Sequence, residues 1–274
     1  ETLPKGRKQK TTALYDRFVN QGAVMGDSFG LENVLWFANN KEDAHEEPTI
    51  KRSRSHDYVS KEVINVRENV GLIEVANFSK HEFKGPDARK FLDHIMAGRL
   101  PKPGRISLSP MLSYRGKLCG DLTVACLDEN EFMVFGSGAA QEMHRRWFES
   151  HLDKFNLSYS NRSDEYHGLS IAGPNSRKVL EKIVRDDVSN EKFKFRDSRR
   201  MFVGGVPAII NRISFTGELG YEIYVAPHYQ LKLYEELIEA GKEFNIKPFG
   251  GRALMSMRLE KNWGAWTLDY RPDF

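Results

Sequence analysis

The sequence has little of what marks secreted, membrane-spanning or metal-binding proteins. It contains two cysteines, Cys119 and Cys126, with no histidines near them at metal-ligand spacing. A disulfide framework or a zinc site is therefore not expected, whereas a reducing compartment is. No run of about eighteen apolar residues occurs, and the N-terminal stretch "ETLPKGRKQK" lacks the apolar core of a signal peptide. We expect no membrane association, and the cytoplasm or the mitochondrial matrix as the compartment.

Several catalytic motifs are also missing. The eight histidines never form H-x-x-x-H or H-E-x-x-H, and no G-x-S-x-G occurs, so we expect no bound metal and no serine-hydrolase site. The stretch "FGSGAA" (135–140) lacks the third glycine of a dinucleotide fingerprint, and a tight turn before a helix is the better interpretation. A net charge of +3 is too small to predict a nucleic-acid partner.

The clearest sign of architecture is an internal repeat. Residues 83–95 read "FKGPDARKFLDHI" and residues 171–183 read "IAGPNSRKVLEKI". Each segment follows an apolar, strand-like run and opens an amphipathic helix, with Gly ending the strand and Pro near the first helical turn. Two related α+β halves would produce this pattern. The alternative is that a common strand-to-helix turn occurs twice by coincidence.

The remaining chain reads as helices and strands after a polar N-terminal region. The first 60 residues are polar apart from the apolar island "GLENVLWFAN" (30–39), which predicts an arm with one anchored segment. We expect a helix running into a strand over 61–75, strands over 120–127 and 131–137, a hairpin over 201–215, and helices over 139–155, 229–244 and 251–263. On the helix 139–155, Met143, Trp147 and Leu152 share one face.

One strand carries a carboxylate at its centre. Residues 214–225 read "SFTGELGYEIYV", and strict alternation would put Glu222 and Tyr224 on one face, opposite Tyr221. Glycine inside a strand often marks a bulge or the close approach of a ligand, and Gly217 and Gly220 precede this acid. The alternative is a solvent-facing glutamate on an ordinary strand.

A second acid stands at the start of an apolar strand. Asp121 follows a glycine in "YRGKLCGDLTV" (114–124). Either this is a functional carboxylate at the mouth of the strand, or it is a strand-edge acid in solvent or a turn cap.

Together these motifs resemble a known family. The stretch 214–225 is similar to the Y-T-G-E-x-G-[FWY]-E signature of the folate-binding aminomethyltransferases, the glycine-cleavage T-protein fold. "GKLCGDLTV" (116–124) resembles that family's G-G-x-x-x-D-L strand entry, and "GGRALMSMRLEKNWGAW" (250–266) resembles its G-x-R-x-x-x-x-R-L-E helix. "LPKPGRISLSPMLSYRGKL" (100–118) and "SNEKFKF" (189–195) are similar to one branch, the C-terminal folate domain of the dimethylglycine and sarcosine dehydrogenase family.

The resemblance implies a fold and a domain organisation. It implies an α+β fold of two pseudo-symmetric ferredoxin-like subdomains, over 61–168 and 169–274, preceded by an arm or linker over 1–60. Full-length members of the branch carry an N-terminal FAD domain and a C-terminal β-barrel, and neither is expected here. Because the sequence begins with Glu1 and stops just after its last helix, we expect a fragment or processed product of a longer protein.

The resemblance also implies a function. It implies a tetrahydrofolate-binding domain that captures the carbon of an oxidised N-methyl amine as 5,10-methylenetetrahydrofolate. The implied partners are folate, the amine-derived one-carbon unit, and an FAD domain of the same parent protein. Two alternatives stay open, namely a non-catalytic regulatory relative of this branch and a stand-alone folate-dependent aminomethyltransferase or demethylase.

Three residues carry the implied chemistry. Glu222 matches the glutamate that pairs with the pterin, whose amino group and ring N–H suit a bidentate carboxylate. Asp121 matches the acid near the N5/N10 edge of the folate, where a carboxylate can accept a proton, and it is the catalytic candidate. Arg252 matches an arginine suited to the carboxylates of the glutamate tail.

Other positions match the family less closely. Phe215 and Tyr221 complete the implied folate-binding residues. However, Phe215 stands where the signature has tyrosine, so its ring can stack on the ligand but cannot donate a hydrogen bond. Leu108 likewise lies where many glycine-cleavage enzymes have a tyrosine.

Overall fold

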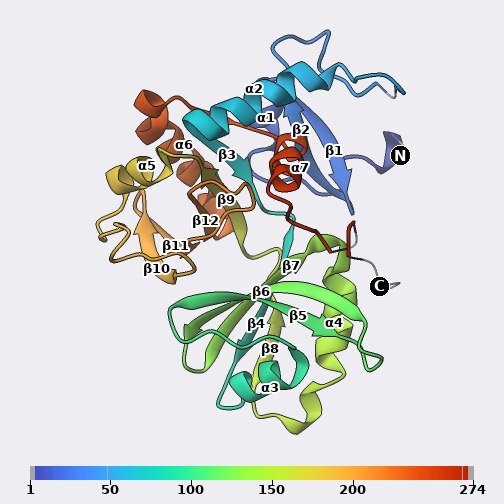
Figure 1. Cartoon of the computed structure of the whole chain (residues 1–274), viewed down its shortest axis with the longest axis vertical. Helices are drawn as coiled ribbons and strands as arrows, with labels where there is room; N and C mark the ends of the chain where they lie inside the picture. The colour runs from blue at the N-terminus through green and yellow to red at the C-terminus, as the bar shows by residue number, and fades with distance from the viewer. Residues whose placement is uncertain (1–3, 48, 267, 271–274) are drawn as a thin grey trace. The chain divides into compact units, whose positions relative to one another are not determined.

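The computed structural model describes residues 4–47, 49–266 and 268–270 (Figure 1). The chain divides into two compact units that are each interrupted in sequence. Unit 1 comprises the residues up to Ala76 together with His167–Lys194 and Met201–Trp263, and unit 2 comprises Asn77–Tyr166, Phe195–Arg200 and the residues from Gly264.

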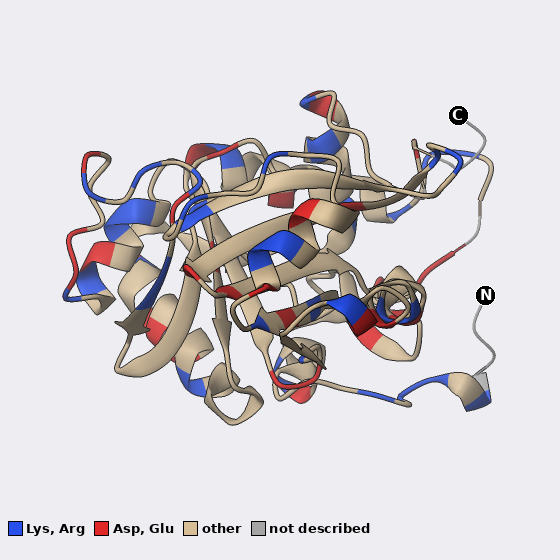
Figure 2. Ribbon diagram, turned by 90° about the horizontal axis from the view of Figure 1, so that it is seen from below, with Lys and Arg blue, Asp and Glu red and all other residues tan. Residues whose placement is uncertain are grey.

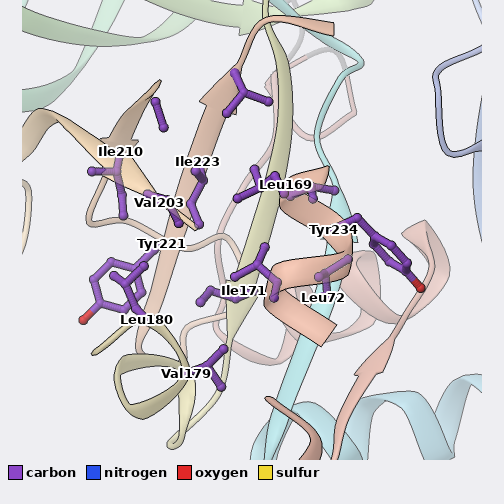
Figure 3. Packing of buried hydrophobic residues seen from close by; sticks show 14 of the residues in the cluster. Leu72, Leu169, Ile171, Val179, Leu180, Val203, Ile210, Tyr221, Ile223 and Tyr234 are labelled. Atoms are coloured by element: carbon purple, nitrogen blue, oxygen red, sulfur yellow. The ribbon is translucent and has the colours of Figure 1, made fainter. Parts of the chain in front are cut away.

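Unit 1 is built on a six-stranded sheet with the order β10-β11-β12-β9-β3-β13. Its strands are β3 (Val70–Glu74), β9 (His167–Ala172), β10 (Ser198–Val203), β11 (Val206–Asn211), β12 (Gly220–Val225) and β13 (Ile246–Pro248). Helices α5 (Ser176–Ile183) and α6 (Gln230–Gly241) bury apolar residues against strand residues such as Ile171 and Ile223 (Figure 3). One face of the sheet therefore belongs to the hydrophobic core.

The polar N-terminal region folds as part of unit 1. It forms α1 (Tyr15–Asn20), a two-stranded sheet of β1 (Ala23–Ser28) and β2 (Leu31–Phe37), and α2 (Ser55–Glu68). Leu14 and Phe18 are buried in the same core as the six-stranded sheet. The predicted arm thus has more than one anchored segment, because apolar residues on α1 as well as β2 find a core to enter.

Unit 2 contains a five-stranded antiparallel sheet with the order β5-β6-β7-β4-β8. Its strands are β4 (Phe78–Lys84), β5 (Arg105–Leu112), β6 (Leu118–Asp128), β7 (Glu131–Ser137) and β8 (Ser158–Asn161). Helices α3 (Ala88–Ile95) and α4 (Gln141–Glu149) carry Phe91, Leu92 and Phe148 into a separate core with Leu122 and Val124 of β6.

The two copies of the sequence repeat adopt the same turn. Gly85 after β4 has φ +137° and Gly173 after β9 has φ +131°. Each glycine carbonyl accepts a hydrogen bond of 3.0 Å from the first helical residue, Ala88 in one copy and Ser176 in the other. A Cβ at Gly85 would lie 2.8 Å from the backbone of Leu157, and one at Gly173 would lie 2.5 Å from the carbonyl oxygen of Val66. Only glycine fits either position.

Strands β3 and β8 are exchanged, because each pairs with the strand that leads into the other copy of the repeat rather than with the strand that follows it in sequence. β3 comes immediately before β4 in sequence but pairs with β9, whereas β8 comes immediately before β9 but pairs with β4. This pairing differs from the division expected from the sequence, which placed 61–75 with the first half. The first four residues of β3 are buried, and a strand with two buried faces suits the interior position between β9 and β13.

Most of the expected elements are present. The helix and strand over 61–75 are α2 and β3, and the hairpin over 201–215 is β10–β11. The helix expected over 139–155 ends at Glu149, and its buried residues are His144 and Phe148. Of the three residues predicted to share an apolar face, Trp147 and Leu152 pack against the core of unit 2, whereas Met143 is 46% exposed. The last helix is α7 (Gly251–Glu260).

Candidate functional site

Glu222 lies in the middle of β12, in the interior of the unit 1 sheet. Strand alternation sends Tyr221, Ile223 and Val225 into the core with α5 and α6, so Glu222 and Tyr224 occupy the opposite face. On that face Glu222 stands between Asn211 of β11 and Ser170 of β9. The predicted alternation is therefore confirmed, and it presents a half-buried carboxylate from an interior strand.

Tyr224 holds the Glu222 carboxylate. Its fully buried hydroxyl donates a hydrogen bond of 2.8 Å to Oε2 of Glu222. Burial, with the neighbouring negative charge of Glu222, raises the pKa of Tyr224 well above its ordinary value, so the phenol stays protonated as a donor. Gly168 on β9 faces Tyr224, and a Cβ there would lie 2.7 Å from the Tyr224 ring. The glycine makes room for the ring that orients the carboxylate.

The loop before β12 is closed by its own polar residues. The Ser214 hydroxyl donates to the Glu218 carbonyl at 2.6 Å, and the Glu218 N–H donates to Oγ1 of Thr216 at 3.2 Å. The Glu218 carboxylate lies 3.6 Å from Nη1 of Arg67. Phe215 is half-buried in this loop. Glu218 is thus engaged in holding the loop, unlike Glu222.

Tyr221 does not lie with Glu222. It is fully buried in the core, where its ring stacks on Phe193 at a centroid distance of 5.9 Å. Its hydroxyl accepts a hydrogen bond of 3.2 Å from Nε of Arg177. Because this side chain points to the α5 side of the sheet, it supports the strand rather than the face that carries Glu222.

Arg252, the second residue of α7, is exposed and already engaged. Its Nη1 donates to Oγ of Ser55 at 3.3 Å, and its Nη2 donates to the Glu46 carboxylate. Arg258, six residues on, is 4% exposed and donates from Nη1 to the carbonyl of Trp263 at 2.8 Å. The two arginines of this helix therefore have different surroundings, one polar and exposed and one buried.

The start of α7 is tied to the N-terminal region by Glu62 of α2. Its carboxylate accepts hydrogen bonds from the N–H of Phe37 at 2.7 Å and from the N–H of Gly250 at 3.0 Å. Burial is the larger influence and raises the pKa of Glu62 to about 7. These bonds join β2, α2 and α7, and so fix the backbone that carries Arg252.

Asp121 belongs to unit 2, where it lies opposite Pro110 near the start of β6. Its neighbours Leu122 and Val124 share the core with α3 and α4, so Asp121 faces the other side of the sheet. Within the described residues its carboxylate has no hydrogen-bond or ion-pair partner. Burial alone raises its pKa above the ordinary range. A desolvated acid without a protein partner is suited to exchange protons with a ligand.

Unit 2 also contains two buried histidines, His81 and His144, whose ring centroids lie 6.4 Å apart. His144 of α4 bonds through Nε2 to the carbonyl of Cys119 at 3.1 Å, and a Cβ at Gly120 would lie 3.0 Å from that nitrogen. His81 of β4 bonds through Nδ1 to the hydroxyl of Tyr159 at 2.9 Å. Burial, with the nearby imidazole of His144, lowers the pKa of His81 to about 3. Burial also lowers the pKa of His144. No sequence pattern pointed to this pair, since His81 stands between two charged residues and His144 is followed by two arginines.

Other kinds of site find no support in the described ranges. Across residues 4–47, 49–266 and 268–270 no cluster of three or more His, Cys, Asp or Glu side chains could hold a metal ion. In the same ranges, no helix has the length and apolar character needed to cross a bilayer. Basic and acidic residues are interspersed along the helices and loops (Figure 2).

Comparison with known proteins gives consistent relatives. The model of the GCVT N-terminal domain family matches residues 14–274. Human mitochondrial dimethylglycine dehydrogenase is 34% identical over 268 residues, which are 97% of this chain and 31% of that protein. The sarcosine oxidase alpha subunit of Rhizobium meliloti (strain 1021) is 32% identical over 260 residues, or 92% of this chain and 25% of that subunit.

A solved structure agrees in fold. The glycine cleavage system aminomethyltransferase T from Bartonella henselae matches with a TM-score of 0.80 at 23% identity, over 97% of this chain and 66% of that one. The chain therefore has the α+β fold of that protein. It spans about a third of the length of dimethylglycine dehydrogenase.

Proposed function

Because the chain belongs to the GCVT N-terminal domain family, we propose that it binds tetrahydrofolate as the one-carbon transfer domain of an FAD-dependent N-methyl amine dehydrogenase. The similarity to dimethylglycine dehydrogenase along nearly the whole chain supports this choice of branch. The observation that carries the proposal is the Glu222 carboxylate, which an interior strand presents half-buried and which Tyr224 orients.

Glu222 is the proposed pterin ligand. A pterin presents an amino group and a ring N–H side by side, and a carboxylate accepts both in a bidentate pair that is strong where water is scarce. The Tyr224 bond to Oε2 fixes the orientation of this carboxylate, and the two oxygens of a carboxylate together offer about four lone-pair sites. Phe215 is the proposed stacking partner, and Tyr221 acts from the core side by holding β12 in place.

Asp121 is the proposed proton acceptor. Tetrahydrofolate supplies the amine nitrogens that take up the one-carbon unit, and these nitrogens lose protons as they do so. Burial raises the pKa of the Asp121 carboxyl, which makes its carboxylate a stronger base than an ordinary aspartate. Because no described residue hydrogen-bonds to this carboxylate, the proton would stay on Asp121 until solvent removes it.

The proposed partner is an FAD domain of the same parent protein. The chain spans 31% of dimethylglycine dehydrogenase, and oxidation of the amine would take place on the FAD of that partner domain. We further propose that the two strand–turn–helix copies, with their matched glycine turns, belong to two pseudo-symmetric ferredoxin-like subdomains. The proposed compartments remain the cytoplasm and the mitochondrial matrix.

Folate titration tests the assignment. We expect the wild type to bind 5-formyltetrahydrofolate, a stable reduced folate, in isothermal titration calorimetry. Glu222→Gln should weaken binding at least about tenfold, because a hydrogen bond to a charged group contributes about 1.5–3 kcal/mol. Glu218→Gln is the matched control, since Glu218 lies in the same stretch but pairs with Arg67. Absence of binding to the wild type, or equal loss in both variants, would refute the assignment.

A non-catalytic relative is the second candidate, favoured by two features. Phe215 cannot donate a hydrogen bond, and Arg252 is engaged by Glu46. Reconstitution with an amine-oxidising flavin domain separates the candidates. A transfer domain should convert the released carbon to 5,10-methylenetetrahydrofolate, whereas free formaldehyde that accumulates despite added tetrahydrofolate would indicate a protein that binds folate without turnover.

A further inference from the structure

The Arg252 guanidinium forms an ion pair with a carboxylate of the same chain, that of Glu46. Its Nη2 donates to Oε2 of Glu46, which lies 206 residues earlier in the chain, and its Nη1 donates to Ser55. Both charged side chains are partly exposed, 41% for Arg252 and 34% for Glu46. The contact is thus a partly solvated ion pair at the arginine that the proposed function assigns to the folate tail.

A hydrogen bond from Trp36 orients the Glu46 carboxylate toward this arginine. The indole Nε1 of Trp36 donates to Oε1 of Glu46 at 2.5 Å. Trp36 is fully buried, and its ring packs on Tyr58 of α2 at a centroid distance of 5.1 Å. One oxygen of Glu46 is therefore held by a rigid donor while the other meets Arg252, much as a bound ligand carboxylate would.

The segment that carries Glu46 is held mainly by side chains. Between β2 and α2, residues 39–47 and 49–54 contain no helix or strand. In these described residues, the backbone hydrogen bonds from Ala44 to Lys41 and from His45 to Asp43 stay within the segment. Asp43 accepts a hydrogen bond of 2.6 Å from the Tyr58 hydroxyl, which anchors the segment before Glu46. Glu46 can leave Arg252 without breaking a sheet or a helix.

We propose that Glu46 is an internal competitor for the carboxylate tail of folate at Arg252. The inference rests on the proposed folate function. A tail carboxylate that approaches the Nη2 edge of the guanidinium meets Glu46 there, so the two carboxylates compete for that donor nitrogen. The displaced acid and its neighbour Glu47 also repel a longer polyglutamate tail, so the segment sets how strongly the chain distinguishes tail lengths.

Binding measurements on two neighbouring acids test this competition. Glu46→Gln should bind 5-formyltetrahydrofolate about two- to fivefold more tightly than the wild type, the range expected for one partly exposed ion pair. The gain should be larger for the triglutamate form than for the monoglutamate. Glu47→Gln removes the same charge from the same segment, but Glu47 pairs with Arg54 at 3.2 Å. Its effect should be smaller for both forms.

A second readout follows the displacement itself. The indole N–H of Trp36, assigned with Trp36→Phe, should change its proton–nitrogen resonance when folate binds the wild type, because Glu46 leaves. In Glu46→Gln this resonance should barely respond to the ligand. A resonance that ignores folate in the wild type would overturn the inference.

The outcomes separate this inference from the function on which it rests. Folate binding by the wild type with an equal or weaker dissociation constant in Glu46→Gln would overturn the competition alone. Equal gains in Glu46→Gln and Glu47→Gln would reduce the effect to general charge and would also overturn it. If neither the wild type nor the variants bound the reduced folate, the folate assignment would fall, and the competition with it.

Discussion

Replacing His81 with phenylalanine should make unit 2 more resistant to acid. His81 is fully buried on β4, with its ring edge-on to Phe148 and stacked on Tyr159, so a phenyl ring suits the surroundings. Its pKa is about 3 in the folded chain, against 6.5 for an ordinary histidine. Below pH 6.5 the unfolded chain therefore binds a proton that the folded chain refuses, and stability falls until the pH reaches about 3.

The size of the effect follows from that difference. At about pH 4.5, two pH units below the ordinary pKa, the wild type loses about 2–3 kcal/mol of unfolding free energy through this one group. The phenylalanine variant lacks the titration and should not lose it. At pH 7 the variant gives up the hydrogen bond to Tyr159, which costs about 1 kcal/mol. The variant should therefore be slightly less stable than the wild type at pH 7 and more stable than the wild type at about pH 4.5.

Urea unfolding at about pH 7 and pH 4.5, followed by tryptophan fluorescence, measures this change. His94→Phe is the matched control, because His94 is an exposed residue of α3 in the same unit. Between the two pH values, the unfolding free energy of His81→Phe relative to the wild type should rise by about 2–3 kcal/mol. His94→Phe should follow the wild type. Parallel behaviour of all three proteins would refute the argument.

Two further predictions concern the repeat turns and the proposed folate face. Gly85→Ala and Gly173→Ala should each lower the free energy of unfolding by about 1–3 kcal/mol or more. Gly205→Ala should lower it by less, because a Cβ at Gly205 meets nothing within 4 Å. Equal shifts of the melting temperature in all three variants would contradict this prediction. Tyr224→Phe should weaken 5-formyltetrahydrofolate binding about three- to tenfold through loss of its bond to Glu222. Tyr221→Phe, which loses a hydroxyl on the core side, should bind normally in the same titration.

Local sequence chemistry predicted the parts of the fold that depend on near neighbours. The repeat was visible in the sequence because glycine and proline stand at the same positions before each short helix. In the structure, Gly85 and Gly173 adopt matching φ angles. Alternation along one strand placed Glu222 and Tyr224 on the same face, away from the core. The family resemblance was confirmed by the family model and by relatives that match nearly the whole chain.

Contacts between distant residues were beyond such reasoning. The pairing of β3 with β9 satisfies backbone groups that every strand possesses, so composition could not select it. Glu46 and Arg252 are separated by 206 residues, and nothing in either local pattern identifies the other. The hydrogen bond from Tyr224 to Glu222 was easier to anticipate, because residues two apart on a strand lie on the same face. Their spacing in the sequence was the signal that pointed to it.

The exchange of β3 and β8 has a consequence for the order in which the chain folds. All five strands of the unit 2 sheet lie within Asn77–Tyr166, so this sheet can close as soon as that stretch leaves the ribosome. β3 emerges earlier, yet its partners β9 and β13 emerge only afterwards. During synthesis an apolar strand therefore stays unpaired until its partners emerge, and an unpaired apolar strand exposes a nascent chain to aggregation.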